Sequence, residues 1–152
     1  MFSQDFHQFV ESLTEAKVDY LIVGGYAVGI HGHPRFTGDM DIWINQNQEN
    51  AKRVIEAIDY FGFSSLGITV NDLLVPKNVI QMGNPPLRID ILTEIDGVGF
   101  EDCFPNKKVV TIAGLQFNFI SYQDLIKNKL ASGRAKDLDD VSNLKPPQES
   151  ES

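Results

Sequence analysis

Two aspartates, Asp39 and Asp41, stand one residue apart in an otherwise apolar segment. Side chains alternate between the two faces of a β-strand. Both carboxylates would therefore lie on one face, while Met40 and Ile42 point toward a core. Neighbouring carboxylates repel each other, and a divalent cation between them would offset that repulsion. Because Mg²⁺ prefers one or two carboxylates together with phosphate oxygens and water, the pair predicts a divalent-cation site that suits Mg²⁺.

A third carboxylate, Asp90, lies in the alternating segment Arg88-Ile89-Asp90-Ile91-Leu92. The isoleucines would face a core and Asp90 the opposite side. If this strand lies beside the strand of Asp39 and Asp41, the three carboxylates form one metal-binding cluster. The alternative is a single edge-strand charge that discourages aggregation. Three carboxylates on strands of alternating pattern favour the cluster.

Gly24-Gly25 follows a short apolar run and precedes a helix that we expect over residues 26–32. A glycine pair lets the backbone approach a phosphate closely, and a helix start offers free N–H groups. A plain turn is the alternative. Arg35 and Thr37 lie on the approach to the aspartates. Arg35 would contact phosphate or pair with a neighbouring acid, and Thr37 would support the loop.

The rest of the chain predicts an α/β (α+β) fold, with a mixed sheet of about five strands flanked by helices. Longer helices are expected over residues 3–17, 46–62, 121–133 and 134–144, with shorter helical segments near 70–74 and 100–103. Strands are expected over residues 18–23, 78–82, 87–92, 108–112 and 115–120, with residues 83–86 as a tight connection.

Length and composition indicate a single domain over residues 1–144, followed by a disordered tail over 145–152. The chain has 152 residues, 42% of them hydrophobic, and a net charge of −8. This acidity argues against a dedicated nucleic-acid binder, which usually has a basic face. The single Cys103 forms no internal disulfide, and we find neither a signal peptide nor a membrane-spanning stretch. We therefore expect a cytoplasmic protein with no membrane partner.

The order Gly-Gly, short helix, Arg-x-Thr and Asp-x-Asp-Ile resembles the nucleotidyltransferase superfamily with the polymerase-β-like core. More narrowly, it resembles the small bacterial branch that includes the AbiEii-type abortive-infection toxins. The signature positions are filled by Gly24, Gly25, Asp39 and Asp41. The resemblance continues to Asp90 and through residues 125–144, so it covers most of the chain. Gly25 stands where many members of the superfamily carry serine.

The resemblance implies transfer of a nucleoside monophosphate from an NTP to RNA, a protein or a small molecule. Asp39, Asp41 and Asp90 would be catalytic and would hold two Mg²⁺ ions, with Mn²⁺ as an alternative. The nucleotide-binding residues implied by the resemblance are Gly24, Gly25, Arg35, Thr37, Lys129, Arg134 and Lys136. Lys129 would reach the triphosphate, with Asp137 beside the site. Without the resemblance, residues 121–144 are typical of a solvated helix pair with alternating charges.

Two other functions stay open from the sequence. One is a toxin–antitoxin component that acts on tRNA, with a cognate antitoxin. The other is a non-catalytic regulator or antitoxin that retains the fold, although a complete set of three carboxylates argues against it. The chain leaves little length for an acceptor-binding domain, so a partner protein or a second copy in a homodimer would supply it.

Overall fold

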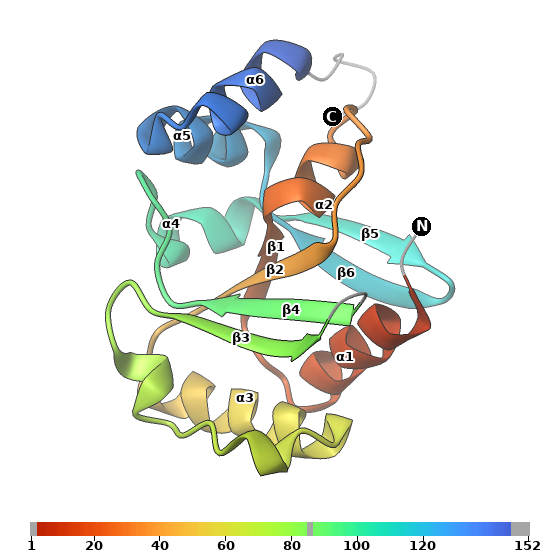
Figure 1. Cartoon of the computed structure of the whole chain (residues 1–152), viewed down its shortest axis with the longest axis vertical. Helices are drawn as coiled ribbons and strands as arrows, with labels where there is room; N and C mark the ends of the chain where they lie inside the picture. Colours follow the sequence, from red (N-terminus) through yellow and green to blue (C-terminus); the bar gives the residue numbers. More distant parts are fainter. Residues whose placement is uncertain (1–2, 85–86, 147–152) are drawn as a thin grey trace.

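A six-stranded mixed sheet runs through the middle of the computed structural model, which describes residues 3–84 and 87–146 (Figure 1). Its strand order is β3-β4-β2-β1-β6-β5. The strands are β1 (Tyr20–Val23), β2 (Asp39–Ile44), β3 (Val79–Asn84), β4 (Leu87–Leu92), β5 (Lys108–Ile112) and β6 (Leu115–Phe119). The α/β class is confirmed, and the sheet has one strand more than the approximate five expected.

The register of the central strands brings the carboxylates together. β2 runs parallel to β4, with Asp41 opposite Asp90 and Asp39 opposite Arg88. β1 runs antiparallel to β2, with Val23 opposite Asp41. Residues paired across a sheet project to the same face. Asp41 and Asp90 are therefore direct neighbours, and the chain leaves β1 immediately beside them.

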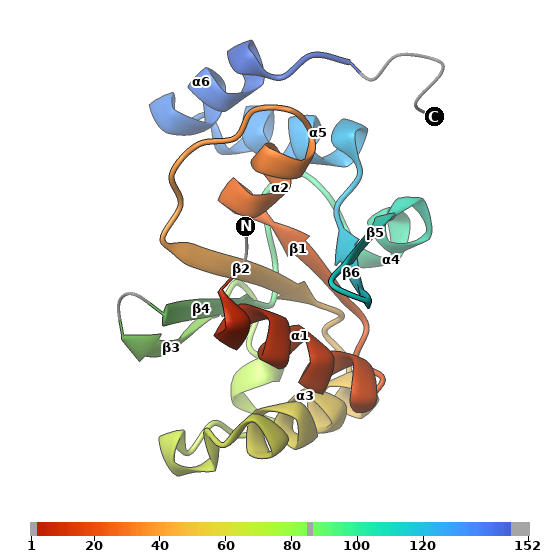
Figure 2. The same cartoon turned by 90° about the vertical axis from the view of Figure 1, so that its right-hand side faces the viewer.

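Two layers of helices cover the sheet. The helices are α1 (Gln4–Glu15), α2 (Gly24–Ile30), α3 (Gln48–Phe61), α4 (Phe100–Cys103), α5 (Tyr122–Ser132) and α6 (Ala135–Asn143). Helices α1 and α3 pack together on one side, and α2, α5 and α6 lie on the other (Figures 1 and 2). Short 3-10 turns occur at Ser64–Leu66, Asp72–Leu74 and Phe104–Asn106.

Polar caps fix where the long helices begin. The Ser3 hydroxyl accepts a hydrogen bond from the Phe6 N–H, and the Ser121 hydroxyl accepts one from Asp124, each at 3.2 Å. Of the two asparagines that precede α3, Asn47 is the cap and accepts from the Asn50 N–H at 2.8 Å. Such side-chain oxygens satisfy N–H groups that have no partner within the helix.

Several element boundaries differ from the sequence expectation. Helix α2 spans Gly24–Ile30 instead of residues 26–32, so the strand passes directly into the helix at the glycine pair and the alternative of a plain turn there is wrong. Strand β3 continues to Asn84, because Gly83 and Asn84 still pair with β4. Pro85 and Pro86 of the expected connection, and residues 147–152 of the expected tail, lie outside the described residues.

The core confirms the apolar patterns of the sequence. Phe6, Phe9 and Leu13 of α1 are almost fully buried, as are all four residues of β1. Cys103 is buried as a packing residue. Among residues 3–84 and 87–146, no helix has the length and apolar character needed to cross a bilayer.

Candidate functional site

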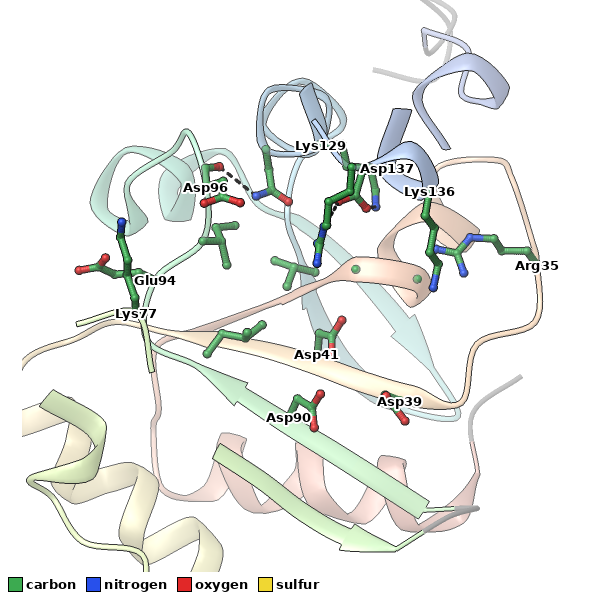
Figure 3. Close-up of a pocket in the computed structure, with 17 residues that line it drawn as sticks. Arg35, Asp39, Asp41, Lys77, Asp90, Glu94, Asp96, Lys129, Lys136 and Asp137 are labelled. Atoms are coloured by element: carbon green, nitrogen blue, oxygen red, sulfur yellow. Dashed lines mark hydrogen bonds and ion pairs between the residues drawn. The ribbon is translucent and has the colours of Figure 1, made fainter. Parts of the chain in front are cut away.

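A cavity of about 440 Å³ opens on the side of the sheet that carries α2, α5 and α6 (Figure 3). Most of the residues singled out from the sequence line this main pocket. They are Gly24, Gly25, Arg35, Asp39, Asp41, Asp90, Lys129, Arg134 and Lys136. Thr37 does not line the main pocket, and every other candidate does.

The floor of the main pocket carries the three carboxylates, with Asp39 and Asp41 on β2 and Asp90 on β4 (Figure 3). Their proximity has an electrostatic consequence. Burial, followed by the charges of Asp90 and Asp39, raises the pKa of Asp41 to about 6. Lys129 acts in the opposite direction but does not cancel the effect. The floor is therefore a concentrated negative site that favours a cation.

The glycine pair forms one edge of this floor. Gly24 has φ +67°, a conformation that favours glycine, and a Cβ there would collide with the carboxylate of Asp41. A Cβ on Gly25 would lie 2.5 Å from the Thr37 hydroxyl oxygen. No side chain caps the start of α2 at Val23. The edge is thus bare backbone, and Thr37 supports the loop by donating to the Asp39 carbonyl at 3.4 Å.

Arg88, which the sequence analysis did not assign to the site, sits between two of the carboxylates. Its Nε lies 3.2 Å from an oxygen of Asp90 and 3.7 Å from an oxygen of Asp39. The hydrogen bond to Asp90 is the main reason that the pKa of Arg88 is raised. The alternation of the strand, which puts Arg88 and Asp90 on one face, was the available signal.

The donor set of the floor fits a hard divalent cation. All three side chains offer carboxylate oxygens, which Mg²⁺ and Mn²⁺ prefer. Burial first, and then the charges of Asp90 and Asp39, raise the pKa of Asp41, and a bound cation would offset the contribution of those charges. Within the described residues, no three His, Cys, Asp or Glu side chains are already drawn together as a metal-binding group. Arg88 supplies the positive charge between Asp39 and Asp90 in this arrangement.

A buried ion-pair network joins α5 and α6 above the floor. Lys129, only 4% exposed, places its Nζ 3.0 Å from Asp137 and 2.9 Å from Asp140. Arg35 binds both oxygens of Asp140, at 2.9 and 3.0 Å. Burial alone would raise the pKa of Asp140, but hydrogen bonds from Arg35 and Lys129 hold it below its usual value. Arg35 therefore makes the ion pair that the sequence left as one of its two alternatives.

Two more cations stand at the mouth of the main pocket. The Arg134 side chain is 78% exposed and its Nε lies 2.9 Å from Asp137. Lys136 is exposed and forms no ion pair within the part of the chain described by the structure. Both are exposed, so Lys136 and the part of the Arg134 guanidinium that does not bind Asp137 can meet an anion from solvent. Arg35 and Lys136 lie together at one end of the pocket (Figure 3), and this end adjoins the glycine edge, because a Cβ on Gly25 would lie 3.4 Å from Arg35 Nη1.

Family comparison agrees with this arrangement. Residues 4–145 match the model of a family described as nucleotidyltransferase of unknown function (DUF6036). The chain belongs to this nucleotidyltransferase family. No protein with curated annotation matches the sequence. The narrower resemblance to AbiEii-type toxins stays a prediction.

Solved structures share the fold of this chain at low sequence identity. A candidate nucleotidyltransferase from Thermotoga maritima has a TM-score of 0.56 and 14% identity, over 94% of each chain. ANT(2″)-Ia in complex with adenylyl-2″-tobramycin has a TM-score of 0.54 and 13% identity, over 90% of this chain and 83% of that one. The solution structure of the same antibiotic-resistance factor also gives 0.54 and 13%, over 91% and 79%. These similarities support the fold alone.

Several residues of the main pocket were not predicted from the sequence. Lys77, Glu94, Asp96 and Asn128 also line the main pocket. The Asn128 side chain donates to the Asp96 carbonyl at 2.9 Å, which ties the loop after β4 to α5. Three of the four lie in loops, where no hydrophobic periodicity marks a direction, so only the tertiary structure brings them to the site.

Proposed function

We propose that this protein transfers a nucleoside monophosphate from an NTP to an acceptor hydroxyl. The acceptor oxygen forms a bond to the α-phosphorus, the bond between the α-phosphorus and its bridging oxygen to the β-phosphate breaks, and pyrophosphate leaves. The hydroxyl proton passes to a carboxylate of the floor and then to solvent. The acceptor classes carried forward from the sequence are RNA, a protein and a small molecule.

One observation carries this proposal: three carboxylates and a bare glycine edge face a group of cations across a single pocket, in a chain of a nucleotidyltransferase family. Exposed Arg134 and Lys136 are suited to the β- and γ-phosphates, because charge-assisted contacts to phosphate are strong. Gly24 and Gly25 let those phosphates approach the backbone. The α-phosphate would then lie above the carboxylates.

The carboxylates would hold the divalent ions. Asp39 and Asp41 would contribute to two Mg²⁺ sites and Asp90 to one, and such ions supply Lewis-acid stabilisation of charge on the reacting phosphate. Asp90, which is 8% exposed and paired with Arg88, is the floor residue that we propose takes the acceptor proton. Its fixed position on β4 favours proton transfer in a defined direction.

Lys129 contributes to the proposed site by holding α6 in place and by adding positive charge to the pocket wall. It remains the sequence-based candidate for the triphosphate, yet its ammonium lies between Asp137 and Asp140. We propose that it adds positive potential to the pocket wall and fixes α6, so that Arg134 and Lys136 at the start of α6 face the phosphates. Its charge also lowers the pKa of Asp41, which favours the ionised form that binds a metal.

A transfer assay tests the proposal. The protein is incubated with each α-labelled NTP, Mg²⁺ and pools of RNA, protein and small metabolites, alongside Asp41→Asn and the matched control Asp59→Asn. Asp59 is exposed on α3, across the sheet from the pocket (Figure 1). We expect Mg²⁺-dependent labelling that falls at least about 100-fold in Asp41→Asn, because charge stabilisation in the transition state is lost, and that is unchanged in Asp59→Asn.

The alternatives give different results. Labelling confined to tRNA would favour the toxin-like function. Labelling that persists in Asp41→Asn would contradict the assigned carboxylate site. A folded protein that binds Mg–NTP yet labels nothing, with or without a partner protein, would favour a non-catalytic regulator.

A further inference from the structure

A second cavity, of about 330 Å³, adjoins the main pocket. Glu94 and Ile95 line both cavities, so the two lie side by side, and together we call them the depression. Trp43 and Phe100 form aromatic walls of the second cavity, and Glu101 lies at its edge. Its volume is within the range of small-molecule sites.

The second cavity lies further along the same strands as the carboxylates. Trp43 follows Asp41 by two residues on β2, so it shares a face of the sheet with the aspartates. Glu94 follows the end of β4, four residues after Asp90. Arg35, by contrast, precedes β2. The depression therefore runs from cations, over the carboxylate floor, to an aromatic and acidic end.

The charge of that end differs from the charge of the phosphate end. Glu94 and Asp96 lie on the opposite side of the main pocket from Arg35 and Lys136 (Figure 3). With Glu101 they make three carboxylates, against one ammonium from Lys77. All three acids are exposed and form no ion pair among the described residues. This end would repel phosphates and attract a cation.

The aromatic walls suit the same kind of ligand. The rings of Trp43 and Phe100 meet edge to face with centroids 5.1 Å apart. An amine near such rings gains a cation–π attraction in addition to its attraction to carboxylates. The indole Nε1 of Trp43 is buried without a hydrogen-bond partner in the described part of the chain. Trp43 is only 2% exposed, so a ligand oxygen would satisfy this unpaired donor only after a small shift of the cavity wall.

We propose that the second cavity binds the acceptor, and that the acceptor is a small molecule carrying both amines and a hydroxyl. This inference rests on the proposed nucleotidyl transfer. The amines would bind at Glu94, Glu101 and the aromatic walls, which would leave the hydroxyl directed toward the carboxylate floor. Transfer would form a phosphoester bond between the acceptor hydroxyl oxygen and the α-phosphorus. The bond from the α-phosphorus to the bridging oxygen would break, pyrophosphate would leave, and the hydroxyl proton would pass to the carboxylate floor.

Binding can be measured without catalysis, because Trp43 is the single tryptophan of the chain and lines the second cavity. The probe is spermidine, a polyamine with no hydroxyl, titrated without nucleotide or metal while tryptophan fluorescence is followed. Sorbitol and NaCl of matched ionic strength are the controls. We expect a saturable change with spermidine alone.

Paired variants locate the binding. Glu94→Gln/Glu101→Gln should weaken spermidine binding about tenfold, because two exposed charge pairs with the polyamine are removed and each contributes modestly. Lys77→Asn, which removes the opposing cation and suits the φ of +54° at that position, should tighten it. Glu56→Gln, exposed on α3, should leave it unchanged. Circular dichroism checks that each variant is folded.

Three results would overturn the inference: no saturable fluorescence change, equal binding by the double variant, or displacement of spermidine by Mg²⁺, which would place the amine on the carboxylate floor. Failure of the proposed function is distinct, because it removes Mg–NTP binding and transfer while the spermidine titration of Trp43 persists. Conversely, efficient labelling of neutral or anionic acceptors, together with unchanged Trp43 fluorescence in the spermidine titration, would overturn only the acceptor assignment.

Discussion

The ionised form of Asp41 is electrostatically unfavourable in the folded protein. It lies opposite Asp90 across the sheet, and its carboxylate occupies the space that a Cβ on Gly24 would need. Burial and two neighbouring negative charges raise its pKa to about 6 from an ordinary 3.8. The folded protein therefore favours the protonated form of Asp41 more than the unfolded chain does, so ionisation of Asp41 lowers the free energy of unfolding.

Asp41→Asn should stabilise the metal-free protein at about pH 8 and not at about pH 4. The raised pKa lowers the free energy of unfolding as the pH rises from about 4 to 6, and a penalty of up to about 3 kcal/mol remains above that range. Urea unfolding at both pH values measures the effect, with Asp59→Asn as control. A variant less stable than wild type at about pH 8 would show that Asp41 makes a contact outweighing the repulsion.

Arg88 competes with a metal ion for the same carboxylates, because its guanidinium lies within 3.7 Å of both Asp39 and Asp90. Arg88→Gln removes one positive charge beside the floor and keeps a shorter, neutral polar side chain. We expect Mn²⁺ to bind several-fold more tightly, since the local potential becomes more negative. Calorimetric titration with Mn²⁺ measures the change. Weaker binding would mean that orienting Asp90 matters more than competition.

At the scale of elements, α6 is held to the molecule largely through ion pairs. Asp137 and Asp140 are its buried charged residues, and their partners lie on α5, at the start of α6 and on the loop before β2. A helix attached in this way depends on every member of the network, because removing one partner leaves another charge buried and unpaired.

Asp140→Asn should therefore destabilise the protein by about 3 kcal/mol at neutral pH, because Lys129 and Arg35 lose a shared carboxylate. Asp139→Asn is the matched control, since Asp139 is the exposed neighbour on the same helix. Chemical unfolding measures both variants. Equal stability of the two would show that apolar packing, such as that of Leu144, holds α6 instead.

The same network gives α6 a pH dependence of definite sign. The pKa of Asp140 is lowered in the folded protein, so its contribution to stability is present above the ordinary carboxyl pKa and is lost as the pH falls through the folded value. As the pH falls, α6 should therefore detach or unfold locally before the sheet unfolds. Hydrogen exchange of α6 amides at decreasing pH would follow this step.

At the scale of the whole molecule, a net charge of −8 coexists with a small cationic group at the mouth of one pocket. This distribution suits a phosphate-bearing small substrate better than a long polyanion. We expect tRNA to bind more weakly than about 100 µM at about 150 mM salt, because few phosphates find a basic partner. Fluorescence anisotropy with labelled tRNA measures this, and micromolar binding would favour the toxin-like alternative.

The amino-acid sequence alone identified the three candidate carboxylates and predicted most of the secondary structure. These features are local: alternation puts Asp39 and Asp41 on one face, apolar spacing marks α1 and α3, and Ser3 and Ser121 cap helices within three residues. The family resemblance added Lys129, Arg134 and Lys136, and all three line the main pocket.

Only the tertiary structure decided how these parts meet. The pairing of Asp41 with Asp90 joins strands nearly fifty residues apart, and the partners of Lys129 and Arg35 were not evident from their positions in the sequence. The second cavity arises where loops after β2 and β4 meet α4, and loops carry no periodicity that predicts their direction. Contacts between distant segments depend on the packing of the whole sheet, so the acidic and aromatic end of the site becomes visible only in the folded molecule.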